Sequence, residues 1–304
     1  MRILSYIGRF APSPTGPLHL GSLVAAVGSW LRARQMGGQW LVRMEDLDPP
    51  REMPGAAVEI LRTLEAHALE WDGDVLYQHD RDEAYRQALD RLIASGHAYC
   101  CRCSRKAIAA AGKRGPYGLI YPGSCRHGAS DATDKPPAWR VITHDEPIGF
   151  DDLRRGHYSQ RLESEVGDFV VKRADGYWAY QLAVVVDDAF QGITEVVRGE
   201  DLLDNTPRQI HLQRLLGLPT PGYLHLPLVT NEHGQKLSKQ TFAKPLDPQR
   251  AAANLLDALR HLGIVLPRTL VAATPAEVLA IASEQVGQPE WDWRNAALPR
   301  VPAF

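Results

Sequence analysis

The sequence predicts an α/β fold built on a parallel sheet, and three observations lead to this expectation. Strand-like and helix-like segments alternate through residues 3–96, which is typical of parallel strands with helices on their faces. The loop at residues 9–22 joins the first strand to the first helix, where open parallel sheets bind their ligands. A cysteine-bearing stretch at residues 99–139 then interrupts the alternation. We therefore expect a sheet-based body that carries an insertion.

The first half of the chain supplies most of the alternation. Apolar residues at helical spacing mark three helices, and glycines stand at the ends of the first and the third. Pro54 suits the first turn of the second helix. We expect, in chain order, a strand at 3–11, a helix at 22–38, a strand at 39–46, and helices at 54–69 and 81–96.

Regular structure resumes at residue 169. Ala174, Asp175 and Gly176 predict a hairpin turn before a helix that ends near Gly192. A strand follows at 193–203, and Thr206 and Pro207 form a good cap and first position for a helix that ends near Leu216. Residues 241–304 hold two helical patterns and a proline-bearing tail. We expect a catalytic domain at 1–98 and 140–245, an insertion at 99–139 and a small C-terminal helical region at 246–304.

The totals exclude several classes of protein. The chain has 304 residues, of which 44% are hydrophobic and 23% charged, as is usual for a soluble globular protein. Its apolar runs are too short to span a membrane, and its N-terminus lacks the apolar core of a signal peptide. We therefore expect a cytoplasmic protein without a membrane partner. The net charge of −2 leaves any nucleic-acid surface to a local patch.

The loop RFAPSPTGPLHLGS, residues 9–22, suits a phosphate. It leads into a helix N-terminus, where unpaired N–H groups and the helix dipole favour an anion. Gly16 and Gly21 allow close approach of the backbone, and His19 can donate to a phosphate oxygen. The alternative is a structural proline-rich connector with a surface histidine.

A second segment, KLSKQ at residues 236–240, places two lysines on either side of a serine. Both ammonium groups could clamp a triphosphate from a loop. Taken alone, the segment is equally compatible with a solvated charged loop.

Together, these segments resemble the two signatures of the class I aminoacyl-tRNA synthetases. The loop at 9–22 resembles the HIGH signature in its glutamate-branch form, and KLSKQ resembles KMSKS. VRMEDLDPPR and VVRGEDLLDNTPRQ are similar to further segments of the glutamyl and glutaminyl branch. Two positions depart from the pattern, because Ser22 replaces the last histidine of HIGH and Gln240 the last serine of KMSKS. The resemblance implies a Rossmann-like parallel sheet.

The resemblance also implies the reaction and its residues. Glutamate attacks the α-phosphate of ATP and releases pyrophosphate, with magnesium accompanying the nucleotide. Catalysis then consists of alignment and charge stabilisation, so we expect His19 and Lys239 to contact the transition state. The ATP site implied by the family comprises Pro12, His19, Gly21, Ser22, Lys236, Ser238 and Lys239.

Glutamate has two carboxylates and one ammonium group. Arginine guanidinium groups suit the carboxylates, and an acidic side chain suits the ammonium group. Arg9 and Arg198 fall where the family binds carboxylates, and Glu45 falls where it binds the ammonium group. Ala11, Ser13 and Tyr180 complete the implied glutamate site. The motif APSPTG together with Glu45 favours glutamate over glutamine. Each residue has a structural alternative, such as a surface ion pair between Arg198 and Glu200.

All four cysteines lie in or beside the insertion, at positions 100, 101, 103 and 125. In a reducing compartment such a cluster indicates a metal site more than disulfides. The residues alone leave Cys100 and His127 as rival fourth ligands. The shortened glutamyl-queuosine tRNA(Asp) synthetases resemble this chain in their Cys-x-Cys and Tyr-x-x-x-Cys pattern, which implies zinc on Cys101, Cys103, Tyr121 and Cys125. Four protein ligands leave no open position, so the zinc would be structural.

The insertion also carries six basic residues, which form either an RNA contact or a solvated face: Arg102, Arg105, Lys106, Lys113, Arg114 and Arg126. Residues 241–304 are too few for the anticodon-binding region of a full-length glutamyl-tRNA synthetase. The resemblance therefore implies transfer of L-glutamate to queuosine at the wobble position of tRNA(Asp), by a monomer without an anticodon-binding domain. The alternatives are a truncated glutamyl-tRNA synthetase that charges tRNA 3′ ends and a non-catalytic synthetase paralogue.

Overall fold

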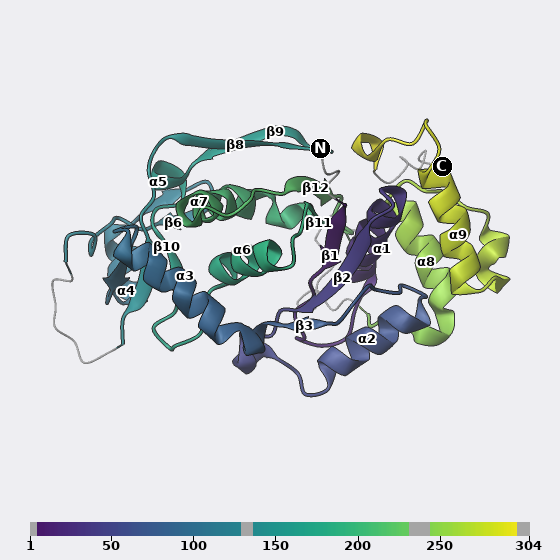
Figure 1. Cartoon of the computed structure of the whole chain (residues 1–304), viewed down its shortest axis with the longest axis horizontal. Coiled ribbons are helices and arrows are strands. Elements are labelled where there is room, and N and C mark those ends of the chain that lie inside the picture. The colour runs from purple at the N-terminus through teal and green to yellow at the C-terminus, as the bar shows by residue number, and fades with distance from the viewer. Residues whose placement is uncertain (1–4, 129–135, 231–243, 297–304) are drawn as a thin grey trace.

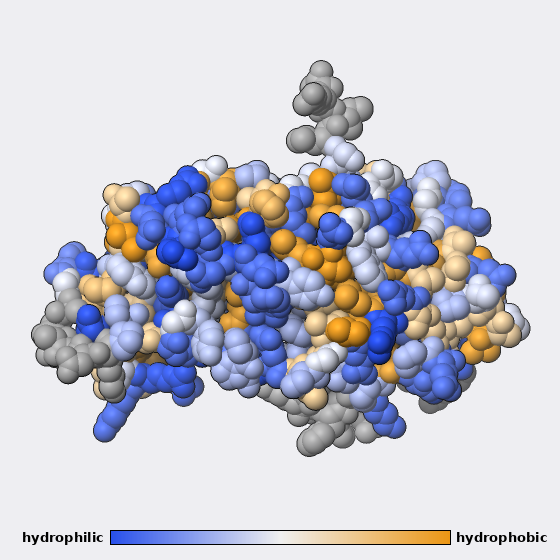
Figure 2. Space-filling view, turned by 60° about the horizontal axis from the view of Figure 1, so that its bottom comes forward, coloured by the Kyte–Doolittle hydropathy of each residue, from blue (hydrophilic) through white to orange (hydrophobic). Residues whose placement is uncertain are grey.

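A computed structural model describes residues 5–128, 136–230 and 244–296 of the chain. The molecule is elongated, with a parallel sheet near its middle, the cysteine-bearing insertion at one end and the C-terminal helices at the other (Figure 1). Within the described ranges, no helix combines the length and apolar character needed to cross a membrane. Hydrophilic side chains cover most of the face in Figure 2, and hydrophobic ones lie between them, mainly toward the middle of the view.

Two groups of strands form the expected parallel sheet. The first has the order β1-β2-β3, and both of its pairs are parallel. The second has the order β11-β12-β8-β9, in which only the β8–β9 pair is antiparallel. The Thr194 N–H donates to the Ile7 carbonyl over 2.9 Å, so the start of β11 adjoins β1. The strands are β1 (Ile7–Phe10), β2 (Gln39–Met44), β3 (Leu76–Tyr77), β8 (Pro147–Asp152), β9 (Gly156–Arg161), β11 (Glu195–Gly199) and β12 (Gly222–Leu226).

Helices connect these strands, as the sequence predicted. The α-helices of this part are α1 (Leu20–Gln35), α2 (Ala56–Ala66), α3 (Asp82–Ala94), α6 (Tyr180–Phe190) and α7 (Thr206–Leu216). Short 3₁₀ turns accompany them at η1 (Pro49–Arg51), η2 (Gln78–Arg81) and η3 (Glu200–Asn205). The predicted hairpin turn before α6 is confirmed, because Arg173 N–H donates to the Tyr177 carbonyl and Gly176 has a φ of +94°.

Three details of the helix starts differ from the predictions. α1 begins at Leu20 instead of Ser22, because His19 acts as its N-cap. Pro54 precedes α2, whose N-cap is Gly55 with a φ of +80°. Thr206 does not cap α7 but lies inside it, because its hydroxyl accepts a hydrogen bond from Arg198 instead.

A small antiparallel sheet with the order β10-β7-β4 carries the insertion of residues 99–139, which runs from β4 to β7. The sheet strands are β4 (Ala98–Cys101), β7 (Ala138–Val141) and β10 (Phe169–Lys172). The insertion itself holds α4 (Arg105–Ala111) and the hairpin of β5 (Lys113–Gly115) and β6 (Gly118–Ile120), and α5 (Leu162–Glu165) precedes β10. β4 and β7 flank the cysteine segment, so the sheet holds both ends of that segment together.

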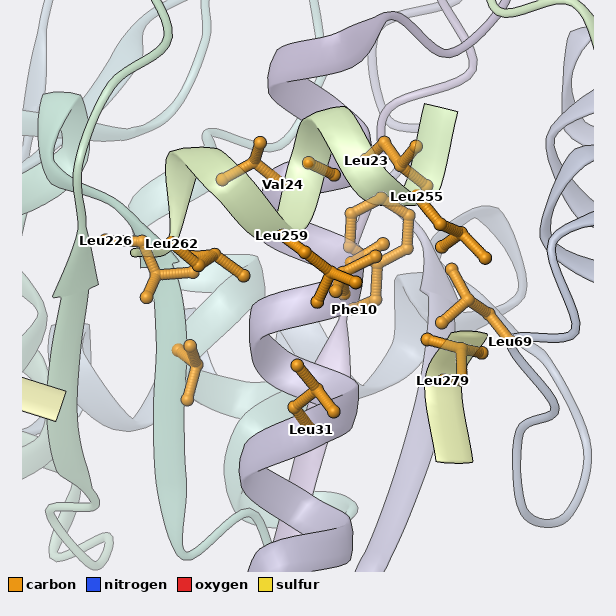
Figure 3. Close-up of a cluster of buried hydrophobic side chains, with 14 of the residues drawn as sticks. Phe10, Leu23, Val24, Leu31, Leu69, Leu226, Leu255, Leu259, Leu262 and Leu279 are labelled. Atoms are coloured by element: carbon orange, nitrogen blue, oxygen red, sulfur yellow. The ribbon is translucent and has the colours of Figure 1, made fainter. Parts of the chain in front are cut away.

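The two predicted C-terminal helices are α8 (Ala251–His261) and α9 (Pro275–Val286), and a capping box of Thr274 and Glu277 starts α9. The 3₁₀ turns η5 (Pro248–Arg250), η6 (Arg268–Ala272) and η7 (Trp293–Asn295) surround them. Leu255 and Leu259 of α8 and Leu262, which caps its end, pack with residues of α1 and β1 in one buried cluster, with Phe10 near its centre (Figure 3). These helices therefore share their core with the sheet, on the side of α1.

Candidate active site

The loop after β1 forms the N-terminus of α1. The imidazole Nδ1 of His19 accepts a hydrogen bond from the Ser22 N–H over 3.3 Å, and the Ser22 hydroxyl lies 3.3 Å from Nε2. Gly16 has a φ of +130°, which favours glycine at that turn. Pro12 is buried, and its carbonyl accepts from the Glu45 N–H over 2.9 Å. The loop that resembles HIGH is therefore fixed against the end of β2.

A pocket of about 200 Å³ opens at this end of α1. Its lining includes His19, Gly21, Ser22, Gly199, Asp201 and Val229. Small-molecule sites usually exceed about 300 Å³, so the pocket as described suits part of a nucleotide. The residues come from the start of α1 and from the ends of β11 and β12, as expected for a ligand site of a parallel sheet.

Lys236, Ser238 and Lys239 lie outside the described residues. The described residues on either side of their segment meet the same pocket. Val229 lines it, Pro245 forms an antiparallel bridge with His19, and the Leu246 N–H donates to the Leu18 carbonyl over 2.9 Å. The described residues on both sides of the lysine segment therefore lie close to this pocket.

Arg9 and Glu45 belong to one buried group of charges. The Arg9 Nε donates to Asp188 Oδ1 over 3.1 Å, and Arg43 Nη1 donates to the same oxygen over 2.8 Å. Arg43 Nη2 donates to Glu45 Oε1 over 3.2 Å. Burial alone would raise the pKa of Asp188, but Arg9 and Arg43 hold it below its usual value. Burial raises the pKa of Glu45, and Arg43 and Arg9 oppose this rise.

Tyr180 connects this group to Arg198. The Tyr180 hydroxyl accepts from Arg198 Nη1 over 3.3 Å. Burial raises the pKa of Tyr180, and the neighbouring charge of Arg198 opposes this rise. The structure thus brings together four of the predicted glutamate-binding residues. Ala11 and Ser13 lie in the adjoining loop, where Ser13 is exposed.

The sequence analysis missed four charged or polar residues that support these side chains. Arg43 and Asp188 link Arg9 to Glu45, and Asp152 and His225 lie behind Arg198. Each is buried. The available signal was a charged residue inside an apolar run, as with Arg43 in QWLVRM and Asp188 in LAVVVDDAF.

The four predicted zinc ligands converge at one end of the insertion. Cys103 Sγ lies 3.4 Å from Cys125 Sγ, and the Tyr121 hydroxyl lies 3.3 Å from Cys101 Sγ and 3.7 Å from Cys103 Sγ. The three sulfur atoms lie within 4.8 Å of one another. Thiolates on one tetrahedral zinc, with bonds of about 2.3 Å, would be roughly 3.8 Å apart, so the cluster fits such an ion.

The surroundings of Tyr121 distinguish the candidates for the fourth ligand. Its hydroxyl accepts from the Cys125 N–H over 3.1 Å, and the Arg140 guanidinium lies 3.8 Å from the centre of its ring. In the described part of the chain, neither Cys100 nor His127 lies within the group of possible metal ligands that Cys101, Cys103 and Cys125 form. Burial and the neighbouring thiols raise the pKa of Tyr121 in the metal-free chain.

The basic residues of the insertion divide into two sets. Arg126 makes ion pairs with Asp168 and Glu163 and donates to the Thr143 carbonyl, so it joins the cysteine loop to α5 and to the residues that follow β7 and precede β10. Its expected place in a positive surface is therefore wrong. The other five side chains are exposed: Arg102, Arg105, Lys106, Lys113 and Arg114.

Comparison with known proteins gives a consistent result. A family model described as the catalytic domain of class I tRNA synthetases (E and Q) matches residues 7–254. A glutamyl-Q tRNA(Asp) synthetase from Thiobacillus denitrificans is 60% identical over 277 residues, which are 91% of this chain and 92% of that protein. One from Neisseria meningitidis serogroup C is 57% identical over 276 residues, which are 90% and 93% of the two chains.

Solved structures share the fold. A glutamate tRNA ligase from Elizabethkingia meningosepticum, crystallised in complex with its amino acid, superposes with a TM-score of 0.75 at 23% identity. The superposition covers 97% of this chain and 66% of that one, so the chain spans about two thirds of the solved protein. At this identity the likeness concerns the fold alone.

Proposed function

This chain belongs to the glutamyl-Q tRNA(Asp) synthetases, a group of class I tRNA synthetases, and from that premise we propose that it activates L-glutamate with ATP and transfers it to queuosine in tRNA(Asp). It is a ligase. In this proposal the acceptor is a hydroxyl of the cyclopentene ring of queuosine at the wobble position, and the tRNA 3′ end is not charged.

The buried charge cluster beside the pocket carries the proposal. Arg9 and Arg198 supply two guanidinium groups for the carboxylates of glutamate, and Glu45 supplies a carboxylate for its ammonium group. Tyr180, which bonds to Arg198, adds a neutral hydrogen-bonding group, and Ala11 and Ser13 lie in the loop that follows Arg9. Two cations and one anion match the charges of the amino acid.

The nucleotide is assigned to the adjoining pocket. His19, Gly21 and Ser22 form its side at the start of α1, and Pro12 lies in the loop that leads to them. Lys236, Ser238 and Lys239 belong to the segment whose described neighbours lie beside the pocket. An oxygen of the glutamate α-carboxylate attacks the α-phosphorus, and pyrophosphate leaves. Magnesium, when bound with ATP, neutralises part of the phosphate charge. No protein nucleophile is needed, so His19 and Lys239 act by positioning and charge stabilisation.

The second step transfers the glutamyl group to tRNA. The ring hydroxyl of queuosine attacks the carbonyl carbon of the adenylate, AMP leaves, and an ester forms. We assign the exposed cations of the insertion, residues 102–114, to the phosphate backbone of the tRNA. Zinc on Cys101, Cys103, Tyr121 and Cys125 would fasten that insertion. The division into catalytic domain, insertion and C-terminal helical region remains part of this proposal.

The deciding experiment measures where labelled glutamate goes. The purified protein is incubated with ATP, labelled L-glutamate and one of three substrates: tRNA(Asp) with queuosine, tRNA(Asp) without it, or tRNA(Glu). We expect labelling of the first alone, and we expect it to survive removal of the 3′ adenosine. Labelling of tRNA(Glu) that depends on its 3′ end would establish a truncated glutamyl-tRNA synthetase instead.

A substitution at His19 tests the chemistry. His19→Asn keeps a residue that caps helices well but removes the imidazole. We expect glutamate-dependent exchange between ATP and pyrophosphate, measured with tRNA present, to fall about 10²-fold, as when one stabilising donor is lost. Absence of this exchange in the wild-type protein would identify a non-catalytic paralogue.

A further inference from the structure

Arg198 is held by neutral groups. It lies on β11, and in the described part of the chain its guanidinium donates to the ring Nε2 of His225 at 3.1 Å, the hydroxyl of Thr206 at 2.7 Å, the hydroxyl of Tyr180 at 3.3 Å and the carbonyl of Leu202 at 3.4 Å. Its side chain is nonetheless buried, at 5% exposure. A buried cation with only neutral acceptors is costly until an anion joins it. This differs from Arg9, which already pairs with Asp188.

His225 is the neighbour of Arg198 across the sheet. The two residues are direct partners in the parallel register of β11 and β12, so their side chains lie on the same face. Arg198 Nε can only donate, so the Nε2 of His225 must accept and carries no proton. The imidazole is therefore neutral, and its proton is on Nδ1.

Asp152, the last residue of β8, fixes this tautomer. Its Oδ2 accepts from the His225 N–H over 3.0 Å and from Nδ1 over 2.7 Å. Its Oδ1 accepts from the N–H groups of Arg154 and Arg155 over 3.0 and 2.8 Å. Neither the Asp152 nor the His225 side chain is exposed, at 0% each. Burial opposes ionisation of Asp152, but these hydrogen bonds hold its pKa below the usual value, so it is a carboxylate that only accepts.

We propose that Asp152 and His225 are positioning residues for glutamate, which fix the tautomer and the direction in which Arg198 presents its guanidinium to a substrate carboxylate. This inference rests on the proposed function, in which Arg198 binds glutamate. The chain of hydrogen bonds runs from the turn after β8, through β12, to β11. It leaves the charge of Arg198 available, because no carboxylate of the described residues pairs with it directly.

The test uses Asp152→Asn, which keeps the size of the side chain. The new amide can donate to Nδ1, which favours the tautomer with a proton on Nε2. That proton would face the Arg198 Nε–H, and two donors cannot form a hydrogen bond. The guanidinium of Arg198 would then lose its contact with His225 and change its orientation. We expect the KM for glutamate in ATP–pyrophosphate exchange, with tRNA present, to rise about 10- to 100-fold, as for the loss of a charged hydrogen bond. The KM for ATP should stay within about twofold, because Arg198 does not contact the nucleotide in this scheme.

Two variants at His225 test the same proposal if Asp152→Asn does not fold. The amide oxygen of Gln can reach the place of Nε2 and accept from Arg198, whereas that of Asn reaches only the place of Nδ1. We expect His225→Gln to keep most of the affinity for glutamate and His225→Asn to lose it. His211→Gln is the matched control, because His211 is also buried but bonds to the Ile142 carbonyl.

The outcomes separate the two proposals. If the wild-type protein shows no glutamate-dependent exchange, the proposed function itself is wrong. If the wild type is active but Asp152→Asn and both His225 variants change only the melting temperature, as His211→Gln does, the network is structural and this inference is overturned. A rise in the KM for ATP equal to that for glutamate would also overturn it.

Discussion

The guanidinium of Arg43 lies 2.8 Å from a carboxylate oxygen of Asp188, with 0% of the Arg43 side chain and 8% of the Asp188 side chain exposed. These residues are 145 positions apart and join β2 to α6. Arg9, on β1, donates to the same oxygen, and the second terminal nitrogen of the Arg43 guanidinium donates to Glu45. The two proposed contacts of glutamate, a guanidinium and a carboxylate, are thus held by one buried chain of alternating charges.

Substitution of Arg43 should change how glutamate binding depends on pH. Burial raises the pKa of Glu45, and Arg43 is the strongest of the groups that lower it. In Arg43→Gln the pKa of Glu45 rises further, so Glu45 stays protonated, and unable to pair with an ammonium group, up to a higher pH. We expect the KM for glutamate to rise as the pH falls in both proteins, and this rise to begin at a higher pH in the variant.

Two other groups act on Glu45, Arg9 on β1 and Asp188 on α6. One of them, Asp188, also loses a partner that lowers its pKa when Arg43 is replaced by Gln. Arg43→Lys keeps the positive charge and is the matched control, whose pH profile should stay near that of the wild type. Three coinciding profiles would show that Arg43 does not control the ionisation of Glu45.

Replacement of Arg198 by lysine should weaken glutamate binding in spite of the retained charge. The planar guanidinium makes several hydrogen bonds in fixed directions, which an ammonium group cannot reproduce. We expect the KM for glutamate to rise about 10- to 100-fold with little change in the KM for ATP. Arg34→Lys, at the far end of α1 where Arg34 pairs with Asp72, should leave both values unchanged. An unaltered KM in Arg198→Lys would remove Arg198 from the substrate site.

The cysteine cluster should bind about one zinc ion per chain. Cys101→Ser should lose the metal and lower the melting temperature, whereas Cys100→Ser, at the adjacent thiol outside the cluster, should keep it. Metal content by mass spectrometry and thermal unfolding measure both effects. Tyr121→Phe decides the fourth ligand, because its zinc affinity falls only if the phenol binds the ion. Equal zinc content in Cys101→Ser and the wild type would contradict the site.

A buried carboxylate at Asp187 offers a test of stability. Tyr85 donates to Asp187 over 2.6 Å and Gln78 over 2.9 Å, and Arg81 adds an ion pair at 3.2 Å. Tyr85→Phe should lower the free energy of unfolding by about 1.5–3 kcal/mol, since it removes one hydrogen bond to a buried charge. Urea denaturation measures this change. Tyr77→Phe is the control, because the ring of Tyr77 contacts His79. An equal loss of unfolding free energy in both variants would mean that the hydrogen bond from Tyr85 to Asp187 does not stabilise the fold.

Local pattern was sufficient for much of the fold. The alternation of strands and helices in the first hundred residues, and the helix ending at Leu216, follow from periodicity and glycine or proline signals. The β8–β9 hairpin was missed because its exposed strands, such as GHYSQR, carry few apolar residues. The prediction of Thr206 as a cap was wrong because its hydroxyl accepts from Arg198 on β11, and local propensity does not report this contact between a strand and a helix.

The site residues also fall into two groups, those that could be predicted from the sequence and those that could not. Arg9, Glu45, Tyr180 and Arg198 could be named by resemblance to a family, and the structure brings them together. The residues that orient them could not be named. Asp152 and His225 are 73 positions apart, and their pairing depends on which strands lie side by side. Periodicity reports only which face of an element is buried.

The bridge between His19 and Pro245 has a consequence for the lysines at 236 and 239. Both ends of residues 231–243 are attached to the rim of one pocket, so the covalent chain limits how far these ammonium groups can travel. Lys239 is five peptide units from Lys244, or at most about 18 Å of extended chain. If these lysines bind the triphosphate as proposed, the tether would hold two cations at a high local concentration near it and would reduce the entropic cost of recruiting them.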